Sequence, residues 1–335
     1  MLGGVMIRDA PILLVSGTLG LDRIHSRRVE DSGWILGGSA AYAAMGAAAG
    51  RGRGMGAGAP SIRLLAVVGS DLSDERLAPL RAQGIELDGV ERRPGKTFRW
   101  KARYDEALHD RRTLLSEPGV MAGPAARLPS GWREPPPTVL LLGCDDPERQ
   151  GAILDAFAVA PPFILADTMR LWIRERREAL LRLLPRVELL LLNDAEAEAL
   201  LAACGGGGGE VAKGEGAAET LARGILGLGA RRVVVKLGAA GACYADGGQT
   251  RRIPPVPLGA GELLDPTGAG DTFAGALAAA VARSLGKWQG GTPGAERLTE
   301  AIVAALPLAT AEASAACQRL GVSRCGEEGA AHVED

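Results

Sequence analysis

The chain has 335 residues, of which 47% are hydrophobic and 23% charged, and its formal net charge is −2. This composition is globular and excludes a strongly basic surface, so we expect no nucleic acid partner. The length suits one large α/β domain or two ordinary domains.

Cysteine and histidine positions argue against a zinc site and against a disulfide framework. The five cysteines contain no C-x-x-C pair, and the three histidines are far apart in the chain. Such cysteine usage is typical of a reducing compartment, so we expect a cytoplasmic protein. No apolar run approaches the roughly 20 residues of a membrane span, and residues 1–9 lack the pattern of a signal peptide. We therefore expect no membrane partner.

Short aliphatic runs alternate with longer stretches at helical spacing, which predicts a largely parallel sheet covered by helices. The predicted strands are 12–16, 64–68, 139–142, 163–166, 189–192 and 233–237. The predicted helices are 39–49, 72–83, 146–157, 172–184, 194–203 and 217–228. We expect the glycine-rich segments 50–59 and 205–209 to be loops and the acidic tail 326–335 to be disordered.

Two segments interrupt the alternation. Residues 21–35 are polar, and residues 96–115 begin with alternating apolar and basic side chains, as a strand exposed on one face would. We interpret 21–35 and 91–115 as a small β lid, and 1–20, 36–90 and 116–325 as the main α/β domain. The alternative is a surface hairpin without a role.

The stretch from Asp265 to Ala276 reads D-P-T-G-A-G-D-T-F-A-G-A and predicts a tight turn that leads into an alanine-rich helix. The N–H groups of Gly268, Ala269 and Gly270 would then face outward and form an anion site with the helix dipole. Asp271 has two interpretations: a helix N-cap, or a general base beside a transferring phosphoryl group.

Asp265 to Phe273 resembles the D-T-x-G-A-G-D-x-F signature of the ribokinase-like (PfkB) carbohydrate kinase family. The resemblance implies a doubly wound, mainly parallel α/β fold with a small β lid. It also implies that Asp271 is the catalytic base and that Gly268, Ala269 and Gly270 form the anion hole.

Further stretches follow in the family's order along nearly the whole chain. Gly37 and Gly38, followed by Tyr42, are similar to the glycine pair that lies against the substrate. Asp22 matches the acidic residue that holds substrate hydroxyls, because a carboxylate accepts several hydrogen bonds. For Asp22 taken alone, a solvated loop carboxylate is the simpler interpretation.

Asn193 and Glu196 resemble the family's N-x-x-E motif, which implies a role in binding Mg²⁺ through water. The same spacing also suits a helix capping box. Asp265 matches a ligand of monovalent cations, so the resemblance extends to a K⁺ site.

The stretch containing Lys236, Gly238 and Gly241 resembles the strand and glycine turn beside the nucleotide phosphates. A lysine at this place would act as a point charge on phosphate.

The chain departs from the family at Pro266, which replaces Thr, and at Tyr42, which replaces Asn. Tyr42 would suit stacking on a nucleobase. Arg99, Lys101 and Arg103 alternate along the expected lid strand and would meet an anionic substrate or form a solvated face. Segments 97–104 and 167–172 are similar to a less characterised branch of the family.

We therefore predict a kinase that uses ATP and Mg²⁺, with K⁺ as a further cofactor, and phosphorylates a hydroxyl of a sugar or sugar-like small molecule. The alternatives are a nucleoside kinase of the same fold and a catalytically idle ligand-binding homologue. A dinucleotide-dependent oxidoreductase is disfavoured, because no G-x-G-x-x-G follows the first strand. The resemblance also allows a homodimer formed through the lid.

Overall fold

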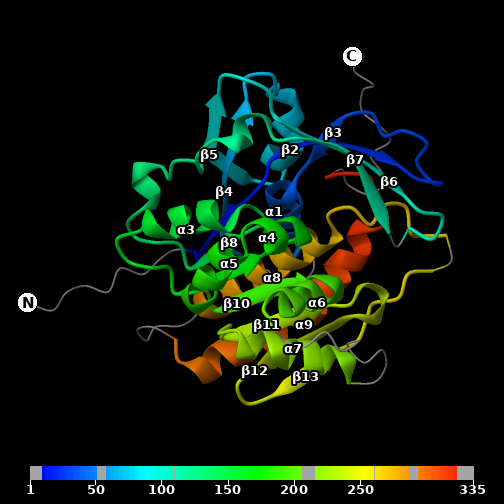
Figure 1. Cartoon of the computed structure of the whole chain (residues 1–335). Coiled ribbons are helices and arrows are strands. Elements are labelled where there is room, and N and C mark those ends of the chain that lie inside the picture. Colours follow the sequence, from blue (N-terminus) through cyan, green and yellow to red (C-terminus); the bar gives the residue numbers. More distant parts are fainter. Residues whose placement is uncertain are drawn as a thin grey trace, which may run out of the picture.

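The computed structural model describes residues 10–50, 58–108, 110–205, 216–259, 261–286 and 293–322. A nine-stranded sheet runs through the centre with helices on both faces, and a four-stranded sheet stands apart from it (Figure 1). The predicted disordered tail and most of the two predicted glycine-rich loops lie outside the described residues.

The nine-stranded sheet is parallel over seven strands and ends in two antiparallel strands. In spatial order the strands are β13 (Thr250–Ile253), β12 (Ala242–Asp246), β11 (Arg232–Lys236), β10 (Leu189–Asn193), β9 (Phe163–Asp167), β8 (Val139–Leu142), β1 (Ile12–Ser16), β4 (Ser61–Gly69) and β5 (Ile85–Arg93). The order reverses between β1 and β8. Open α/β sheets bind ligands at such a reversal, outside the carboxyl ends of the strands.

The central strands carry buried aliphatic side chains on both faces. In β10, Leu189 and Leu191 pack into one hydrophobic cluster, whereas Leu190 and Leu192 pack into another on the opposite face. This doubly wound arrangement confirms the predicted fold class.

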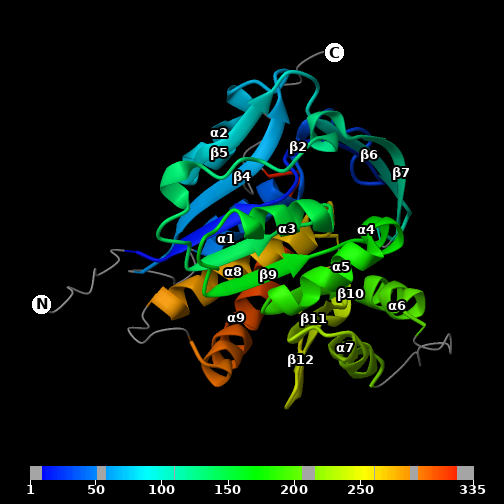
Figure 2. The same cartoon turned by 60° about the vertical axis from the view of Figure 1, so that its left-hand side comes forward.

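Helices cover the two faces as separate groups (Figure 2). One group is α1 (Ser39–Gly50), α2 (Ala78–Ala82), α8 (Ala269–Gly286) and α9 (Ala295–Ala316). The other group is α3 (Pro147–Asp155), α4 (Arg170–Glu175), α5 (Arg177–Leu183), α6 (Asp194–Ala203) and α7 (Ala217–Gly227).

The four-stranded sheet has the order β3 (Ile35–Gly37), β2 (Gly20–His25), β6 (Phe98–Tyr104) and β7 (Arg111–Glu117). Strands β2 and β6 are parallel, and the other two pairs are antiparallel. Its bounds differ from those of the predicted lid at four places. Strand β2 begins at Gly20 and β7 ends at Glu117, and both residues were assigned to the main domain. Residues 91–93, assigned to the lid, continue β5 in the nine-stranded sheet, and Leu36 and Gly37 pair with β2 instead of belonging to the main domain.

Two predicted helices are shorter or broken in the structure. The predicted helix 72–83 is reduced to a 3₁₀ turn, Glu75–Leu77, and the short α2, because Pro79 cannot occupy a helix interior. The predicted helix 172–184 divides into α4 and α5 at Arg176, which has φ −133° and pairs with Asp146 of the neighbouring helix start.

Helix α9 has the length and hydropathy of a membrane span, although it contains no long uninterrupted apolar run. It packs against α8, and its Leu298, Ile302 and Leu306 belong to the largest hydrophobic cluster. The four described cysteines, Cys144, Cys204, Cys243 and Cys317, are unpaired.

Candidate active site

The turn before α8 has the predicted form. Gly268 has φ +74°, a left-handed conformation that favours glycine, and α8 begins at Ala269. The N–H of Thr267 is bonded to Asp265 Oδ1 at 2.9 Å, which closes the turn. One part of the prediction is wrong: the N–H of Ala269 is not free, because it donates to Pro266 O at 3.2 Å. For the N–H groups of Gly268 and Gly270, the described residues offer no acceptor.

Asp271 is the third residue of α8, so it is not the N-cap. Burial raises its pKa to about 7, and the negative charges of Asp167 and Asp22 act in the same direction. Lys236 and Arg111 oppose the rise. A carboxylate with a pKa near neutral pH is suited to accept a proton from a hydroxyl.

Tyr42 joins this turn to Asp22. Its ring lies against Gly268, where any Cβ would overlap the ring atoms. Its hydroxyl donates to Asp22 Oδ2 at 3.1 Å, and the side chain is only 4% exposed. The interpretation of Tyr42 as a stacking surface for a nucleobase is therefore wrong, because both its ring and its hydroxyl are engaged inside the protein.

Asp22 is held from two sides. The N–H of Gly38 lies 3.4 Å from Oδ2, and a Cβ at Gly37 would overlap the carboxylate, so this position must be glycine. Asp22 is 3% exposed, and burial raises its pKa to about 7, although the Tyr42 and Gly38 bonds lower it. Gly37, Gly38, Tyr42 and Asp22 thus form one connected unit beside Gly268.

Further polar groups lie at the carboxyl ends of β9, β10 and β11, which are neighbours in the nine-stranded sheet. Lys236, at the end of β11, pairs with Asp167, at the end of β9, with 2.6 Å between Nζ and Oδ2. Its Nζ would be 3.2 Å from a Cβ placed on Gly270, so the lysine lies beside the start of α8. Asp167 was not among the predicted site residues. Its place directly after a buried strand was the available signal.

Asn193 and Glu196 form a capping box at the start of α6. The Asn193 side chain accepts from the Glu196 N–H, and Glu196 Oε2 accepts from the Asn193 N–H, both at 2.8 Å. Burial raises the pKa of Glu196, Lys236 lowers it and Asp167 raises it again. Glu196 therefore belongs electrostatically to the same group as Lys236 and Asp167.

Gly238 and Gly241 follow β11 in different surroundings. Gly238 has φ +54° and no atom within 4 Å of a Cβ, so its backbone faces open space. Gly241 has φ +86°, and a Cβ there would overlap Ile253 O. Close contact with β13 thus requires a glycine at position 241.

Asp265 is buried behind the turn. Its N–H donates to Cys317 O at 3.1 Å, while Oδ2 has no partner among the described residues. Burial raises the pKa of this carboxyl group. A buried carboxylate oxygen without a donor suits a cation.

The basic side chains of β6 lie on the face away from these residues. Arg99 pairs with Asp71 at 3.4 Å and stacks on Trp34, with 5.4 Å between Cζ and the ring centroid. Tyr104 faces the site instead, with its Oη 2.9 Å from Thr267 Oγ1. Because alternate residues share a face, Lys101 and Arg103 lie with Arg99. Their interpretation as contacts for an anionic substrate is therefore wrong.

Trp100 and Arg111 are site-facing residues that the sequence analysis missed. The Arg111 guanidinium lies over the Trp100 ring, 5.2 Å from its centroid, and Trp100 Nε1 donates to Thr113 Oγ1 at 3.2 Å. The alternation in β6 indicates that Trp100 shares a face with Tyr104, but Arg111 is identified only by its pairing with Tyr104 across the strands.

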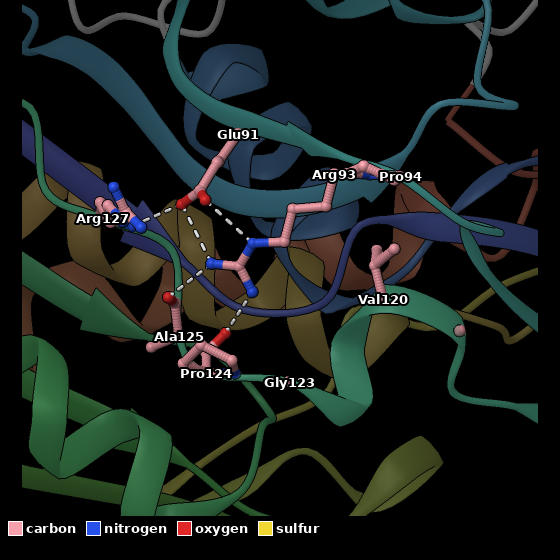
Figure 3. A pocket seen from close by; sticks show the side chains of 9 residues that line it. Glu91, Arg93, Pro94, Val120, Gly123, Pro124, Ala125 and Arg127 are labelled. Carbon is pink, nitrogen blue, oxygen red and sulfur yellow. Dashed lines mark hydrogen bonds and ion pairs between the residues drawn. The ribbon is translucent and has the colours of Figure 1, made fainter.

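A surface hollow beside β5 contains none of these residues (Figure 3). Its central arginine, Arg93, pairs with Glu91 at 2.9 Å and donates to the carbonyls of Pro124 and Ala125 at 2.7 and 2.9 Å. These bonds fasten the connection that leads to β8, so we assign the hollow a structural role.

Comparisons with known proteins bear on the family and the fold of the chain. The family model described as "pfkB family carbohydrate kinase" matches residues 155–328. A cytidine kinase from Thermococcus kodakarensis is 29% identical over 239 residues, which are 71% of this chain and 80% of that protein.

Solved structures share the fold at lower identity. The ribokinase of Cryptococcus neoformans var. grubii, in complex with ADP, has a TM-score of 0.69 at 20% identity, covering 93% of this chain and 96% of that one. The adenosine kinase of Sinorhizobium meliloti has a TM-score of 0.66 at 17% identity, covering 94% and 96%. The predicted family and the predicted enzyme class are confirmed: the chain is a kinase that belongs to the pfkB family of carbohydrate kinases.

Proposed function

We propose that this kinase transfers the γ-phosphoryl group of ATP to a hydroxyl of a sugar or sugar-like small molecule, with Asp271 as the base. The observation that carries the proposal is the position of Asp271 in the first turn of α8, next to free N–H groups and with a pKa of about 7. Deprotonation of the acceptor and stabilisation of phosphoryl charge then occur at one helix terminus.

The surroundings divide the proposed site into two parts. Asp22, held by Tyr42 and Gly38, binds acceptor hydroxyls on one side of Asp271. On the other side, Lys236 and the open turn at Gly238 bind the nucleotide phosphates. Gly268 and Gly270 allow the phosphoryl group to approach the backbone between the two parts.

The cation assignments follow from the available donors. Among the described residues no three carboxylates, histidines or cysteines are grouped closely enough to hold a metal by themselves. Asn193 and Glu196 carry the oxygen atoms that Mg²⁺ prefers, and they fit an ion that keeps waters and takes the remaining ligands from phosphates. When bound, Mg²⁺ neutralises charge on the phosphates during transfer. Asp265 Oδ2 fits K⁺, because it is buried without a donor.

A nucleoside is the second candidate acceptor, and the 29% identity to a cytidine kinase favours it. Since Tyr42 is buried, a nucleobase would have to contact other side chains, and Trp100 is the half-buried aromatic residue on the site-facing side of β6.

The test is release of ADP from Mg-ATP, with K⁺ present, over a panel of sugars, sugar phosphates and nucleosides. Turnover with one acceptor class should vanish in Asp271→Asn and persist in Asp155→Asn, which removes an exposed carboxylate from α3. Asp271→Asn should melt no lower than the wild type, because it removes a buried charge. Turnover retained in Asp271→Asn would disprove the mechanism. ATP binding without turnover of any acceptor in the panel would overturn the proposed acceptor class.

A further inference from the structure

Arg111 approaches the site from the side opposite α8. It is the first residue of β7 and pairs with Tyr104 of β6. Its guanidinium lies over Trp100, so the side chain is on the same face of the four-stranded sheet as Trp100 and Tyr104.

This face of the four-stranded sheet faces the turn at Gly268 that precedes α8. Tyr104 Oη is 2.9 Å from Thr267 Oγ1, four residues before Asp271. Trp100 pairs with Asp22 in the parallel register of β2 and β6. Arg111 is therefore next to two side chains whose own neighbours, Thr267 and Asp22, border the proposed acceptor site.

The charge balance of the site leaves Arg111 available for an anion. Asp22, Asp167, Glu196 and Asp271 are all carboxylates of this site, and the other cation, Lys236, is already paired with Asp167. Within the part of the chain that the structure describes, no carboxylate lies within ion-pair distance of Arg111. Arg111 is exposed as a residue, but its guanidinium loses solvent beside Trp100 and Tyr104, which lowers its pKa; Tyr104, Asp271 and Glu196 raise the pKa by more, so the guanidinium is in a negative field.

We propose that Arg111 is a catalytic residue that binds the transferring phosphoryl group from the four-stranded sheet, opposite the N–H groups of α8 and Lys236. This inference rests on the proposed function. In the step, a bond forms between the acceptor oxygen and the γ-phosphorus while the bond from that phosphorus to the ADP oxygen breaks. The acceptor proton goes to Asp271, and Arg111 donates hydrogen bonds to the phosphoryl oxygens without transferring a proton.

The neighbours of Arg111 favour the phosphoryl group over an anionic group on the acceptor. Besides Tyr104, the negative groups that raise the pKa of Arg111 are Asp271 and Glu196, and Glu196 belongs to the phosphate side of the site. Trp100 supports one face of the guanidinium, which leaves its N–H edge for two parallel bonds to phosphoryl oxygens. A lysine cannot reproduce that geometry.

The test compares Arg111→Met and Arg111→Lys with Arg112→Met. Arg112 is the next residue of β7 and pairs with Arg103, so it lies on the opposite face of the sheet. The Arg112→Met variant therefore removes the same positive charge from the face that is turned away from the site. We expect kcat to fall about 10²–10³-fold in Arg111→Met, with each KM within about threefold of the wild type. Arg111→Lys should recover part of the loss, and Arg112→Met should match the wild type.

A rise in the acceptor KM with unchanged kcat would overturn the proposal and make Arg111 an acceptor contact; unchanged kinetics would also overturn it. If the wild type itself shows no turnover, the proposed function fails, but the role of Arg111 can still be tested by nucleotide binding. The ratio of Mg-ATP to Mg-ADP affinity should fall about three- to tenfold in Arg111→Met but not in Arg112→Met. An equal ratio of Mg-ATP to Mg-ADP affinity in the wild type, Arg111→Met and Arg112→Met would overturn the proposed role of Arg111.

Discussion

The site is built between two regions with opposite kinds of packing. We define the helical floor as α1 and α8; nearly every residue of α1 and most of α8 are buried. The two helices touch through glycines: a Cβ at Gly46 would overlap Thr272 O, and one at Gly275 would overlap Ala43 O. The helical floor therefore has no room for another atom along this contact.

The four-stranded sheet is packed loosely by comparison. Four consecutive residues of β7, from Arg111 to Leu114, are exposed, and its separate hydrophobic cluster is built around Ile24, Tyr104 and Leu108. Rigid packing thus positions Asp271, whereas Asp22 and Arg111 come from a sheet with a small core. We expect changes in the helical floor to alter stability and activity together, and changes in the sheet to alter activity more than stability.

The largest expected effect is on the helical floor. Gly275→Ala should lower the free energy of unfolding by about 3 kcal/mol or more, because the added methyl group overlaps a helix backbone that cannot yield. The measurement is the midpoint of urea unfolding. Gly227→Ala is the control, since it adds the same methyl group in α7 where nothing lies within 4 Å, and it should be neutral or slightly stabilising. Equal stability of the two variants would contradict the close packing.

Gly268→Ala should lower kcat about 10²–10³-fold. The methyl group would overlap the Tyr42 ring and displace the N–H groups of the turn from the phosphoryl group. Gly205→Ala is a matched control, because Gly205 has φ +76°, close to the φ +74° of Gly268, but nothing within 4 Å of a Cβ. Both variants carry the left-handed strain, so a loss confined to Gly268→Ala isolates the contact with Tyr42.

The pH dependence should identify the base. The pKa of Asp271 is raised to about 7: burial and the charges of Asp167 and Asp22 raise it, while Lys236 and Arg111 lower it. Only the deprotonated form accepts a proton, so kcat/KM should fall about tenfold per pH unit below 7. Arg111→Met removes a nearby positive charge and should shift this acid limb to higher pH. A profile flat from pH 5 to 8, with nucleotide binding unchanged, would exclude Asp271 as the base.

The smallest effect is expected in the four-stranded sheet. Tyr104→Phe removes the bond to Thr267 and should lower kcat/KM about three- to tenfold, with about 1 kcal/mol or less lost in stability. Tyr244→Phe removes a hydroxyl bonded to Asp246 at 2.8 Å in β12 and should affect stability only. A large fall in stability for Tyr104→Phe would show that the sheet is part of the rigid framework.

Local sequence was sufficient wherever neighbouring residues determine the structure. The turn at Gly268, the helix that follows it and the capping box of Asn193 and Glu196 all depend on residues within a few positions of each other. The buried strands were equally clear, because a run such as 189–192 is apolar on both faces. The fold class follows from the alternation of such strands with helices.

Tertiary structure decided which way side chains face and what lies opposite them. A period of two shows that Arg99 and Trp100 lie on opposite faces of β6 but not which face is turned to the site. The burial of Tyr42 depends on contact with Gly268, which is 226 positions away in the chain. The ion pair of Asp167 with Lys236 and the approach of Arg111 likewise depend on strand pairings. Such pairings are absent from local sequence, because they exist only once distant segments pack together.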